Sequence, residues 1–300
     1  LLEDSAMRHT QSDVGFSVQL SGGLDSSLLV ALLKKNVNKD IDTYSLTLDD
    51  DEKDESKYQK IVNKLYPTNH HAIYFDSIKF AESFENTIKS LESPTAHHGC
   101  ILLFKLCEEI SKKNKVVITG EGADEFFGGY SRYHNVEKFL YLKKISKYIP
   151  DFFFDKIKKL NFLNHYKNSD PYIELMTFSK FDVLKEVFPN QFIDYDFRES
   201  ILNRFANSLD KISAYDQTIY LESLLLRQDK ISMAHSLEVR VPFVFLPLVK
   251  FVNSLNRKLK YDRKITKKIL KQVSVKYFPN NFINREKNGL KLPIPRWLHN

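Results

Sequence analysis

The opening stretch of the chain alternates between short apolar runs and longer amphipathic runs. Four short segments show the close apolar alternation typical of strands, at residues 14–20, 41–48, 72–75 and 115–119. The stretches between them space apolar residues as helices do, at residues 28–35, 55–66, 78–91 and 102–111. Strands that alternate with helices pair in parallel through right-handed crossovers. The pattern therefore predicts a doubly wound α/β fold with its ligand at the carboxyl ends of the strands.

The second half of the chain has a different pattern. No convincing alternating strand follows Tyr130, and residues 136–148 and 216–233 are rich in Phe, Tyr, Lys and Leu at helical spacing. We therefore expect an α/β core over about residues 1–135 and a helical part over about residues 136–300 that completes the same cleft. The cluster Asp151–Phe154 is interpreted as a packed helix rather than an exposed partner surface.

Composition narrows the class of protein. Hydrophobic residues make up 42% of the chain, and no apolar run approaches the roughly 20 residues that cross a bilayer, so we expect a soluble, cytoplasmic protein. Cys100 and Cys107 are spaced unlike a zinc or redox pair, and buried free thiols are expected. The histidine pairs at 70–71 and 97–98 are assigned surface or packing roles. The net charge of +7 favours anionic ligands but does not by itself identify nucleic acid.

Glycine marks the candidate site. Six of the 9 glycines fall in two short segments, each directly after a predicted strand. The first, Ser21–Ser27 (SGGLDSS), also precedes a predicted helix, so backbone N–H groups, a positive helix end and three hydroxyls converge on one point that suits an anion. The segment is neither a Walker A loop, which needs a lysine after its second glycine, nor a GxGxxG fingerprint.

Four motifs in order resemble one family. Ser21–Ser27 is similar to the pyrophosphate loop of the ATP pyrophosphatases, which activate a carboxylate or carbonyl oxygen as its adenylate. Thr119–Tyr130, Arg227–Phe243 and Arg285–Trp297 resemble the remaining signatures of the asparagine synthetase C-terminal domain. The resemblance spans nearly the whole chain. It implies a parallel five-stranded sheet of the adenine-nucleotide alpha-hydrolase type with an α-helical C-terminal half.

The resemblance also implies a nucleotide and metal site for ATP and Mg²⁺. Asp25 and Asp124 each follow a strand of the same sheet, and carboxylate oxygens suit Mg²⁺. Taken without the resemblance, Asp124 fits a helix-capping residue equally well. The residues expected to bind ATP and pyrophosphate are Ser21, Gly22, Gly23, Leu24, Asp25, Ser26, Ser27, Leu46, Gly120, Lys267 and Lys287.

Three residues are expected to be catalytic. Lys287 matches a lysine that stabilises the adenylation transition state in the family, and Lys267 matches an upstream lysine that reaches the pyrophosphate. Glu121 is implied to lie beside the acyl-adenylate and to position or deprotonate the incoming amine. The candidate substrate contacts are Tyr130, Arg227, Asp229, Glu238 and Arg240, although the last four could instead form salt bridges that shape the cleft.

The function implied is an ATP-dependent amide-forming ligase. It would adenylate the side-chain carboxylate of aspartate and transfer ammonia, normally from glutamine, to give asparagine. Full-length members carry an N-terminal glutaminase domain that this chain lacks, so we expect a trimmed longer protein or a separate glutaminase. The oligomeric state is left open, with a homodimer as one alternative.

Alternative functions remain. Where the family usually continues Arg-Val-Pro-Phe-Leu-Asp, this chain has Phe243-Val-Phe245. The lost Asp leaves open a related amidotransferase or cyclase that acts on another carboxylate, of the β-lactam, lasso-peptide or surface-sugar type. A tRNA-thiolating enzyme would need catalytic cysteines and an RNA domain that we do not find, so no nucleic acid or membrane partner is expected. A non-catalytic binding module is disfavoured by the intact Asp25, Asp124 and Lys287.

Overall fold

A computed structural model of the 300-residue chain describes most of it, and its contacts form two compact units. The described residues are 1–48, 55–95, 97–150, 186–189, 200, 202, 204, 208–262, 264–285 and 294–298. The first unit comprises residues 1–126, 222–255 and 269–300, and the second comprises residues 127–221 and 256–268. Segments 222–255 and 269–300, which the sequence pattern groups with the helical half, thus belong to the unit that contains the sheet. The cluster Asp151–Phe154 lies outside the described residues.

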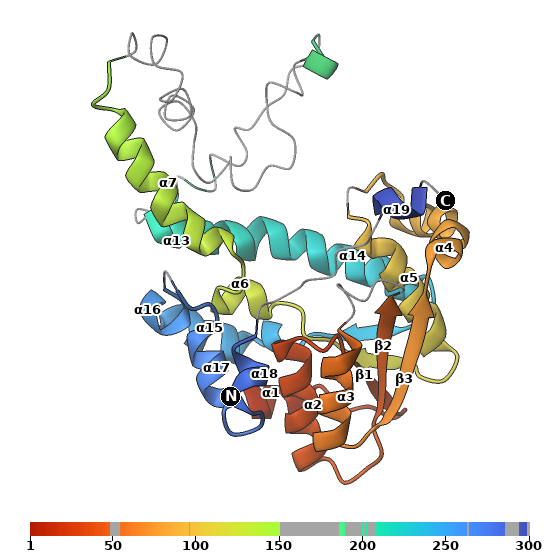
Figure 1. Ribbon diagram of the computed structural model, residues 1–300. Coiled ribbons are helices and arrows are strands. Elements are labelled where there is room, and N and C mark those ends of the chain that lie inside the picture. The colour runs from red at the N-terminus through yellow and green to blue at the C-terminus, as the bar shows by residue number, and fades with distance from the viewer. Residues whose placement is uncertain are drawn as a thin grey trace. The chain divides into compact units, whose positions relative to one another are not determined.

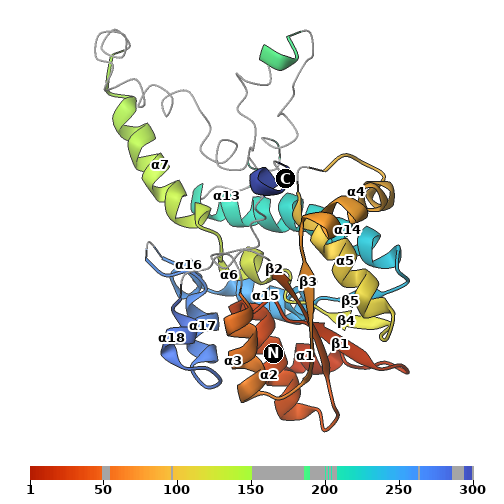
Figure 2. The same cartoon turned by 45° about the vertical axis from the view of Figure 1, so that its right-hand side comes forward.

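A five-stranded parallel sheet forms the centre of the first unit, as the sequence and its family resemblance predict. The strand order is β3-β2-β1-β4-β5 (Figures 1 and 2). The strands are β1 Phe16–Gln19, β2 Asp42–Leu48, β3 Asn69–Phe75, β4 Val116–Ile118 and β5 Glu238–Arg240. Since β1 lies between β2 and β4, the loops that follow β1 and β4 leave neighbouring strands at the same edge.

Helices cover both faces of this sheet. Helix α2 contacts β1 and α3 contacts β2 on one face, whereas α5 contacts β2 and β3 on the other (Figure 2). The helices that lie wholly or almost wholly in the first unit are α1 Leu2–Arg8, α2 Leu24–Asn36, α3 Ser56–Leu65, α4 Ser77–Leu91, α5 Gly99–Ser111, α6 Ala123–Phe127, α14 Leu221–Met233, the 3-10 turn η3 Pro242–Val244, α15 Leu246–Ser254, α17 Lys268–Ser274, α18 Asn280–Ile283 and α19 Ile294–Leu298.

The core of the first unit joins distant parts of the sequence. On the α5 face, Tyr44, Val117, Ile231 and Leu237 are buried in one cluster with both cysteines. Cys100 and Cys107 are free and buried, which confirms their expected role. In a second cluster, Trp297 of α19 packs against Phe75 and Phe80 with ring centroids 6.0 and 5.5 Å apart. The last helix of the chain is therefore anchored to the end of β3 and to α4.

Strand β3 begins three residues earlier than the apolar pattern predicts. The residues at its start are polar, so they do not continue the apolar alternation. Thr43 and Ser45 contact His70 at 2.9 and 3.2 Å, and burial lowers the pKa of this histidine. His71 stacks on Tyr44, with centroids 4.6 Å apart, and pairs with Asp42 at 3.0 Å. The first histidine pair thus has packing roles, as expected.

The prediction that no strand follows Tyr130 was wrong. Residues Glu238–Arg240 form β5, which pairs in parallel with β4 at the edge of the sheet. This strand is only 3 residues long, and two of them are charged, so it shows no apolar alternation that a sequence pattern could reveal. Short edge strands with charged side chains are common, since only one of their sides is paired.

The second unit is helical in its described residues. It contains α7 Arg132–Ser146, α13 Ser208–Tyr215, the π-helical segment η2 Asp216–Tyr220 and α16 Arg257–Lys260. Tyr133, Leu202, Ile212, Tyr215 and Tyr261 form its buried cluster. The buried carboxylate of Asp216 binds the guanidinium of Arg132 through two hydrogen bonds, at 3.1 and 2.7 Å, which joins η2 to α7.

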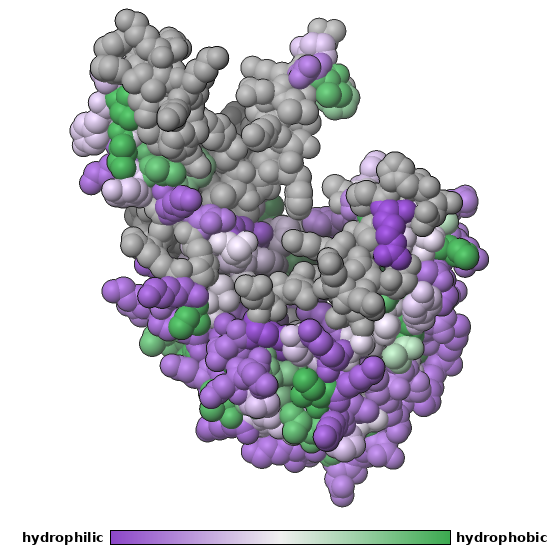
Figure 3. Space-filling view, in the orientation of Figure 1, coloured by the Kyte–Doolittle hydropathy of each residue, from purple (hydrophilic) through white to green (hydrophobic). Residues whose placement is uncertain are grey.

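The described residues on the face seen in Figure 3 are mainly hydrophilic, with small apolar areas between them. Across the described part of the chain, no helix has the length and apolar character that crossing a membrane requires.

Candidate active site

The loop between β1 and α2 has the geometry of an anion site. Gly22 has φ +86°, a left-handed conformation that favours glycine, and Gly23 is the N-cap of α2. The Ser21 N–H donates to Ser26 Oγ at 3.2 Å, and the Ser27 hydroxyl donates to the Gly23 carbonyl at 2.7 Å. Within the described chain no side chain caps α2. The N–H groups of its first turn can therefore donate hydrogen bonds to an anion placed at this helix end.

A second loop touches the first. After β4, the chain passes through Gly120 and Gly122 into α6, and the Thr119 N–H donates to the Arg240 carbonyl at 2.9 Å. A Cβ atom at Gly120 would lie 3.0 Å from the backbone nitrogen of Ser26 and 3.2 Å from Cβ of Asp25. Only glycine allows the two loops to approach this closely.

This contact bears on the metal expected here. Asp25 and Asp124 lie in the first turns of α2 and α6, the helices that follow the two touching loops, and their carboxylates are hard oxygen donors of the kind that Mg²⁺ prefers. Among the residues that the structure describes, no group of three or more His, Cys, Asp or Glu could bind a metal ion alone. The donor chemistry of the two aspartates fits Mg²⁺.

Glu121 lies in the loop after β4, where its side chain is buried near other charged groups. Burial raises the pKa of its carboxyl to about 7, Arg227 on α14 opposes that rise, and Glu125 adds to it. Glu121 Oε2 is buried and makes no hydrogen bond with the described residues. Arg227 also acts, with burial as the larger cause, to lower the pKa of His97. The structure thus brings together two predicted residues, Glu121 and Arg227, from distant motifs.

Burial also raises the pKa of the Cys107 thiol to about 12, with a smaller contribution from the nearby Glu121 charge. A thiol with so high a pKa stays protonated at neutral pH, and thiolate is the reactive form. Cys107 therefore fits a packing role and not a nucleophilic one.

Leu46 lies on β2 and is linked through Gln59 to Ser21, at the start of the loop between β1 and α2. Its side chain is half-buried, and its carbonyl accepts a hydrogen bond from Gln59 Nε2 at 3.2 Å. The same Nε2 donates to the Ser21 carbonyl at 3.4 Å, and Gln59 Oε1 accepts from Ser45 Oγ at 2.9 Å. Gln59 is buried, and the sequence analysis missed it because a lone polar residue on an amphipathic helix resembles a solvent-facing one.

The remaining predicted residues of the first unit are less closely tied to these loops. Asp229 is exposed on α14. Arg240 binds Glu238 at 2.8 Å and the His9 carbonyl at 2.9 Å, so it holds the segment after α1. Phe245, which stands where the family motif has Asp, packs edge-on against His9 with centroids 6.1 Å apart.

Two predicted residues lie in the second unit. Tyr130 stacks in parallel with Tyr133, with centroids 6.4 Å apart, and the guanidinium of Arg132 lies 3.8 Å from the centre of its ring. Lys267 is only 5% exposed and has φ +53°, an unusual backbone conformation for a lysine. Lys287 lies outside the described residues.

Comparison with known proteins gives one consistent family. The family model described as asparagine synthase matches residues 1–300. The chain is 26% identical to asparagine synthetase (glutamine-hydrolyzing) 1 of Bacillus subtilis, over 99% of this chain and 49% of that protein. It is 27% identical to asparagine synthetase (glutamine-hydrolyzing) 3 of the same organism, over 100% of this chain and 48% of that protein.

Other matches cover a smaller part of the chain or have a lower structural similarity. Asparagine synthetase B (glutamine-hydrolyzing) of Escherichia coli is 30% identical over 44% of this chain and 26% of its own length. The chain spans about half the length of the curated relatives that it matches throughout. Among solved structures, the U34-tRNA thiolase NcsA of Methanococcus maripaludis matches with a TM-score of 0.32 and 13% identity, over 97% of this chain and 89% of its own, which is too slight to support an argument.

Proposed function

Since the chain belongs to the asparagine synthase family, we propose that it adenylates a carboxylate with ATP and transfers the activated acyl group to ammonia. The observation that carries this proposal is the contact of the two strand-end loops at Gly120, with the buried carboxyl of Glu121 next in sequence. A phosphate loop alone would suit many nucleotide enzymes. A phosphate loop joined to a carboxyl with a pKa of about 7 suits one that must also accept a proton near neutral pH.

The proposed first step forms the adenylate. A substrate carboxylate oxygen attacks the α-phosphorus of ATP, and the bond to the β-phosphate oxygen breaks to release pyrophosphate. The N–H groups at the start of α2 and the hydroxyls of Ser21, Ser26 and Ser27 bind and orient the phosphates. Asp25 and Asp124 would hold Mg²⁺, which when bound would neutralise charge on the leaving group. Lys267 and Lys287 would add fixed positive charge that stabilises the transition state.

The proposed second step forms the amide. Ammonia attacks the acyl carbon, the bond to the AMP oxygen breaks, and the attacking nitrogen must lose a proton. Glu121 is the proposed acceptor of that proton, because it combines a raised pKa with the neighbouring positive charge of Arg227. Tyr130 is proposed to line the acceptor space.

We propose aspartate as the acceptor and asparagine as the product, with ammonia supplied from glutamine. The support is the relatives, which are named as glutamine-hydrolysing asparagine synthetases and are about twice as long as this chain. A glutaminase domain or a separate glutaminase would therefore be the partner. The aromatic Phe245 in place of the family Asp favours one alternative, a related ligase that amidates or cyclises another carboxylate.

Product analysis with labelled nitrogen tests the proposal. The protein is incubated with ATP, Mg²⁺, ¹⁵N-ammonium and aspartate, or with glutamate as a control carboxylate, and the amides are identified by mass spectrometry. Labelled asparagine with aspartate alone supports the proposal. Turnover that requires a different carboxylate would move the assignment to the alternative, and no labelled amide with any carboxylate would overturn both.

A lysine pair separates catalysis from folding in the same assay. Lys287→Ala is expected to lower kcat at least ~10²-fold while ATP still binds, because a charge placed on the migrating phosphate acts mainly in the transition state. The control is Lys276→Ala, which removes an exposed lysine. Equal activity of the two variants would contradict the role of Lys287.

A further inference from the structure

An arginine outside the expected site reaches the phosphate loop. Arg285, 263 positions from Gly22 in the sequence, donates a hydrogen bond from Nη2 to the Gly22 carbonyl. Its Nη1 donates to the carbonyl of Phe282 at 2.9 Å. The guanidinium thus connects the phosphate loop to the end of α18, directly before the segment that contains Lys287.

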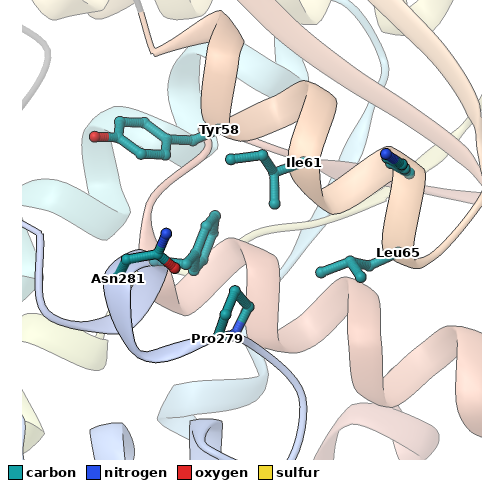
Figure 4. Close-up of a pocket in the computed structure, with 7 residues that line it drawn as sticks. Tyr58, Ile61, Leu65, Pro279 and Asn281 are labelled. Carbon is teal, nitrogen blue, oxygen red and sulfur yellow. The ribbon is translucent and has the colours of Figure 1, made fainter.

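Two aromatic rings hold this guanidinium in place. Its central carbon lies 3.8 Å from the ring centre of Tyr58 on α3 and 4.3 Å from that of Phe282 on α18. The two rings are edge-to-face, with centroids 5.9 Å apart. Figure 4 shows Tyr58 and Ile61 of α3 facing the chain segment of Pro279 and Asn281. Contact with both rings holds the guanidinium in position between α3 and α18.

The charge of Arg285 is directed at the loop. Burial lowers the pKa of its guanidinium, whereas Glu55, Tyr58 and Asp25 favour the charged form. An arginine stays charged at neutral pH even so. The cation is therefore kept near Asp25, in the loop that is expected to receive phosphates.

The peptide group between Gly22 and Gly23 is held at both ends. Arg285 binds its carbonyl, and its N–H donates to Ser21 Oγ at 3.1 Å. The preceding carbonyl, of Ser21, accepts from Gln59 Nε2 at 3.4 Å. Because C=O and N–H point in opposite directions in a trans peptide, binding each carbonyl sets the direction in which the N–H groups of the loop point.

The left-handed turn depends on the same supports. A Cβ atom at Gly22 would lie 3.1 Å from the Glu55 carbonyl oxygen and 3.3 Å from Gln59 Cγ. The start of α3 thus packs against one side of the loop while Arg285 binds the other end of the same glycine. Without the guanidinium, the Gly22 carbonyl would lose this side-chain donor, and the Gly22–Gly23 peptide could rotate.

We propose that Arg285 is a positioning residue that holds the Gly22–Gly23 peptide, and through it the loop before α2, in the conformation that binds the ATP phosphates. The inference rests on the proposed function for its ligand, ATP, but the hydrogen bonds that shape the loop come from this chain's own residues. Arg285 acts through the loop and not by contact with reacting atoms. A lysine, which has charge but no planar fork, should not replace it.

The test compares Arg285→Lys with the parent, by ATP titration and by hydrogen–deuterium exchange of the peptide that contains residues 20–24 without nucleotide. We expect Arg285→Lys to weaken ATP binding at least ~10-fold and to speed exchange of that peptide, since a lost charge-assisted bond is worth about one decade in affinity. Parent-like affinity with unchanged exchange would overturn the inference. Failure of the parent to bind ATP would instead overturn the proposed function.

Two tyrosine variants test the inference even if Arg285→Lys fails to fold. Tyr58→Leu removes one ring from the guanidinium, and Tyr66→Leu removes a comparable ring at the end of α3 that packs edge-on against Phe278 at 5.6 Å without contacting Arg285. We expect Tyr58→Leu to weaken ATP binding about 3-fold or more and Tyr66→Leu to leave it within about 2-fold. Equal affinities of these two variants would overturn the inference independently.

Discussion

Glu121 is held in surroundings that oppose its charge. Burial raises the pKa of its carboxyl to about 7, and the nearby Arg227 limits the rise. In the folded protein this group therefore exchanges its proton near neutral pH, where an ordinary glutamate is already ionised. The same shift affects stability: the unfolded chain releases the proton near pH 4.5 and the folded chain near 7, so the free energy of unfolding falls as pH rises between these values.

The pH dependence of amide formation should report this carboxyl. If Glu121 accepts a proton as the carboxylate, kcat should rise with an apparent pKa of about 7, measured at a constant concentration of unprotonated ammonia. Arg227→Met should move the rise to higher pH, because the opposing positive charge is gone. Glu222→Gln, at an exposed position on the same helix as Arg227, is the control. An unmoved profile in Arg227→Met would show that another group titrates.

The metal requirement should depend on both aspartates. Asp25→Asn and Asp124→Asn each remove one carboxylate charge with little change in shape, so each should raise the Mg²⁺ concentration needed for half-maximal turnover, by about 10-fold or more. Initial rates over a range of Mg²⁺ at saturating ATP measure this. If either variant titrates like the parent, its aspartate is not a metal ligand.

At the scale of elements, the sequence pattern was sufficient where apolar alternation was strong. Strands β1, β2 and β4 lie inside the predicted segments because buried parallel strands need apolar residues on both faces. The pattern was insufficient for β5 and for the start of β3. The residues at the start of β3 make hydrogen bonds with β2, and those of β5 pair with β4 at the edge of the sheet. Both roles depend on a partner strand that the local sequence does not reveal.

Gly120 tests how closely two elements must approach. Gly120→Ala puts a Cβ atom 3.0 Å from the Ser26 backbone nitrogen, and backbone cannot move aside as a flexible side chain can. We expect it to destabilise the fold by about 1–3 kcal/mol and to weaken ATP binding. The control is Gly99→Ala, where a Cβ atom meets nothing within 4 Å. Urea unfolding and ATP titration compare them, and equal results would show that the loops do not need this contact.

The π-helical segment of the second unit depends on one ion pair. Asp216 is 0% and Arg132 17% exposed, whereas the comparable Asp4–Arg8 pair on α1 is 50% and 60% exposed. Asp216→Asn should cost about 3 kcal/mol, because it leaves Arg132, which is only 17% exposed, without its countercharge. Asp4→Asn should cost less than about 1 kcal/mol. Chemical denaturation measures both, and a cost below 1 kcal/mol for Asp216→Asn would contradict the account.

At the scale of the whole molecule, four separated motifs identified the family, and the sheet explains why motifs so far apart can act together. The first two follow neighbouring strands, so the sequence alone predicted that Ser21–Ser27 and Gly120 belong to one site. It did not predict Arg285 or Gln59 as supports of the loop. Each is a polar residue whose partner lies on another element, and helical periodicity specifies a face without specifying what packs on it.

The nature of the nucleotide product tests the central claim most directly. The claim is that the loops at the ends of β1 and β4 direct a carboxylate to the α-phosphorus of ATP. The protein is supplied with ATP, Mg²⁺, aspartate and ammonium, and the spent nucleotide is separated by chromatography while inorganic products are assayed. The account predicts AMP and pyrophosphate in equal amounts. ADP and orthophosphate as the products would contradict it.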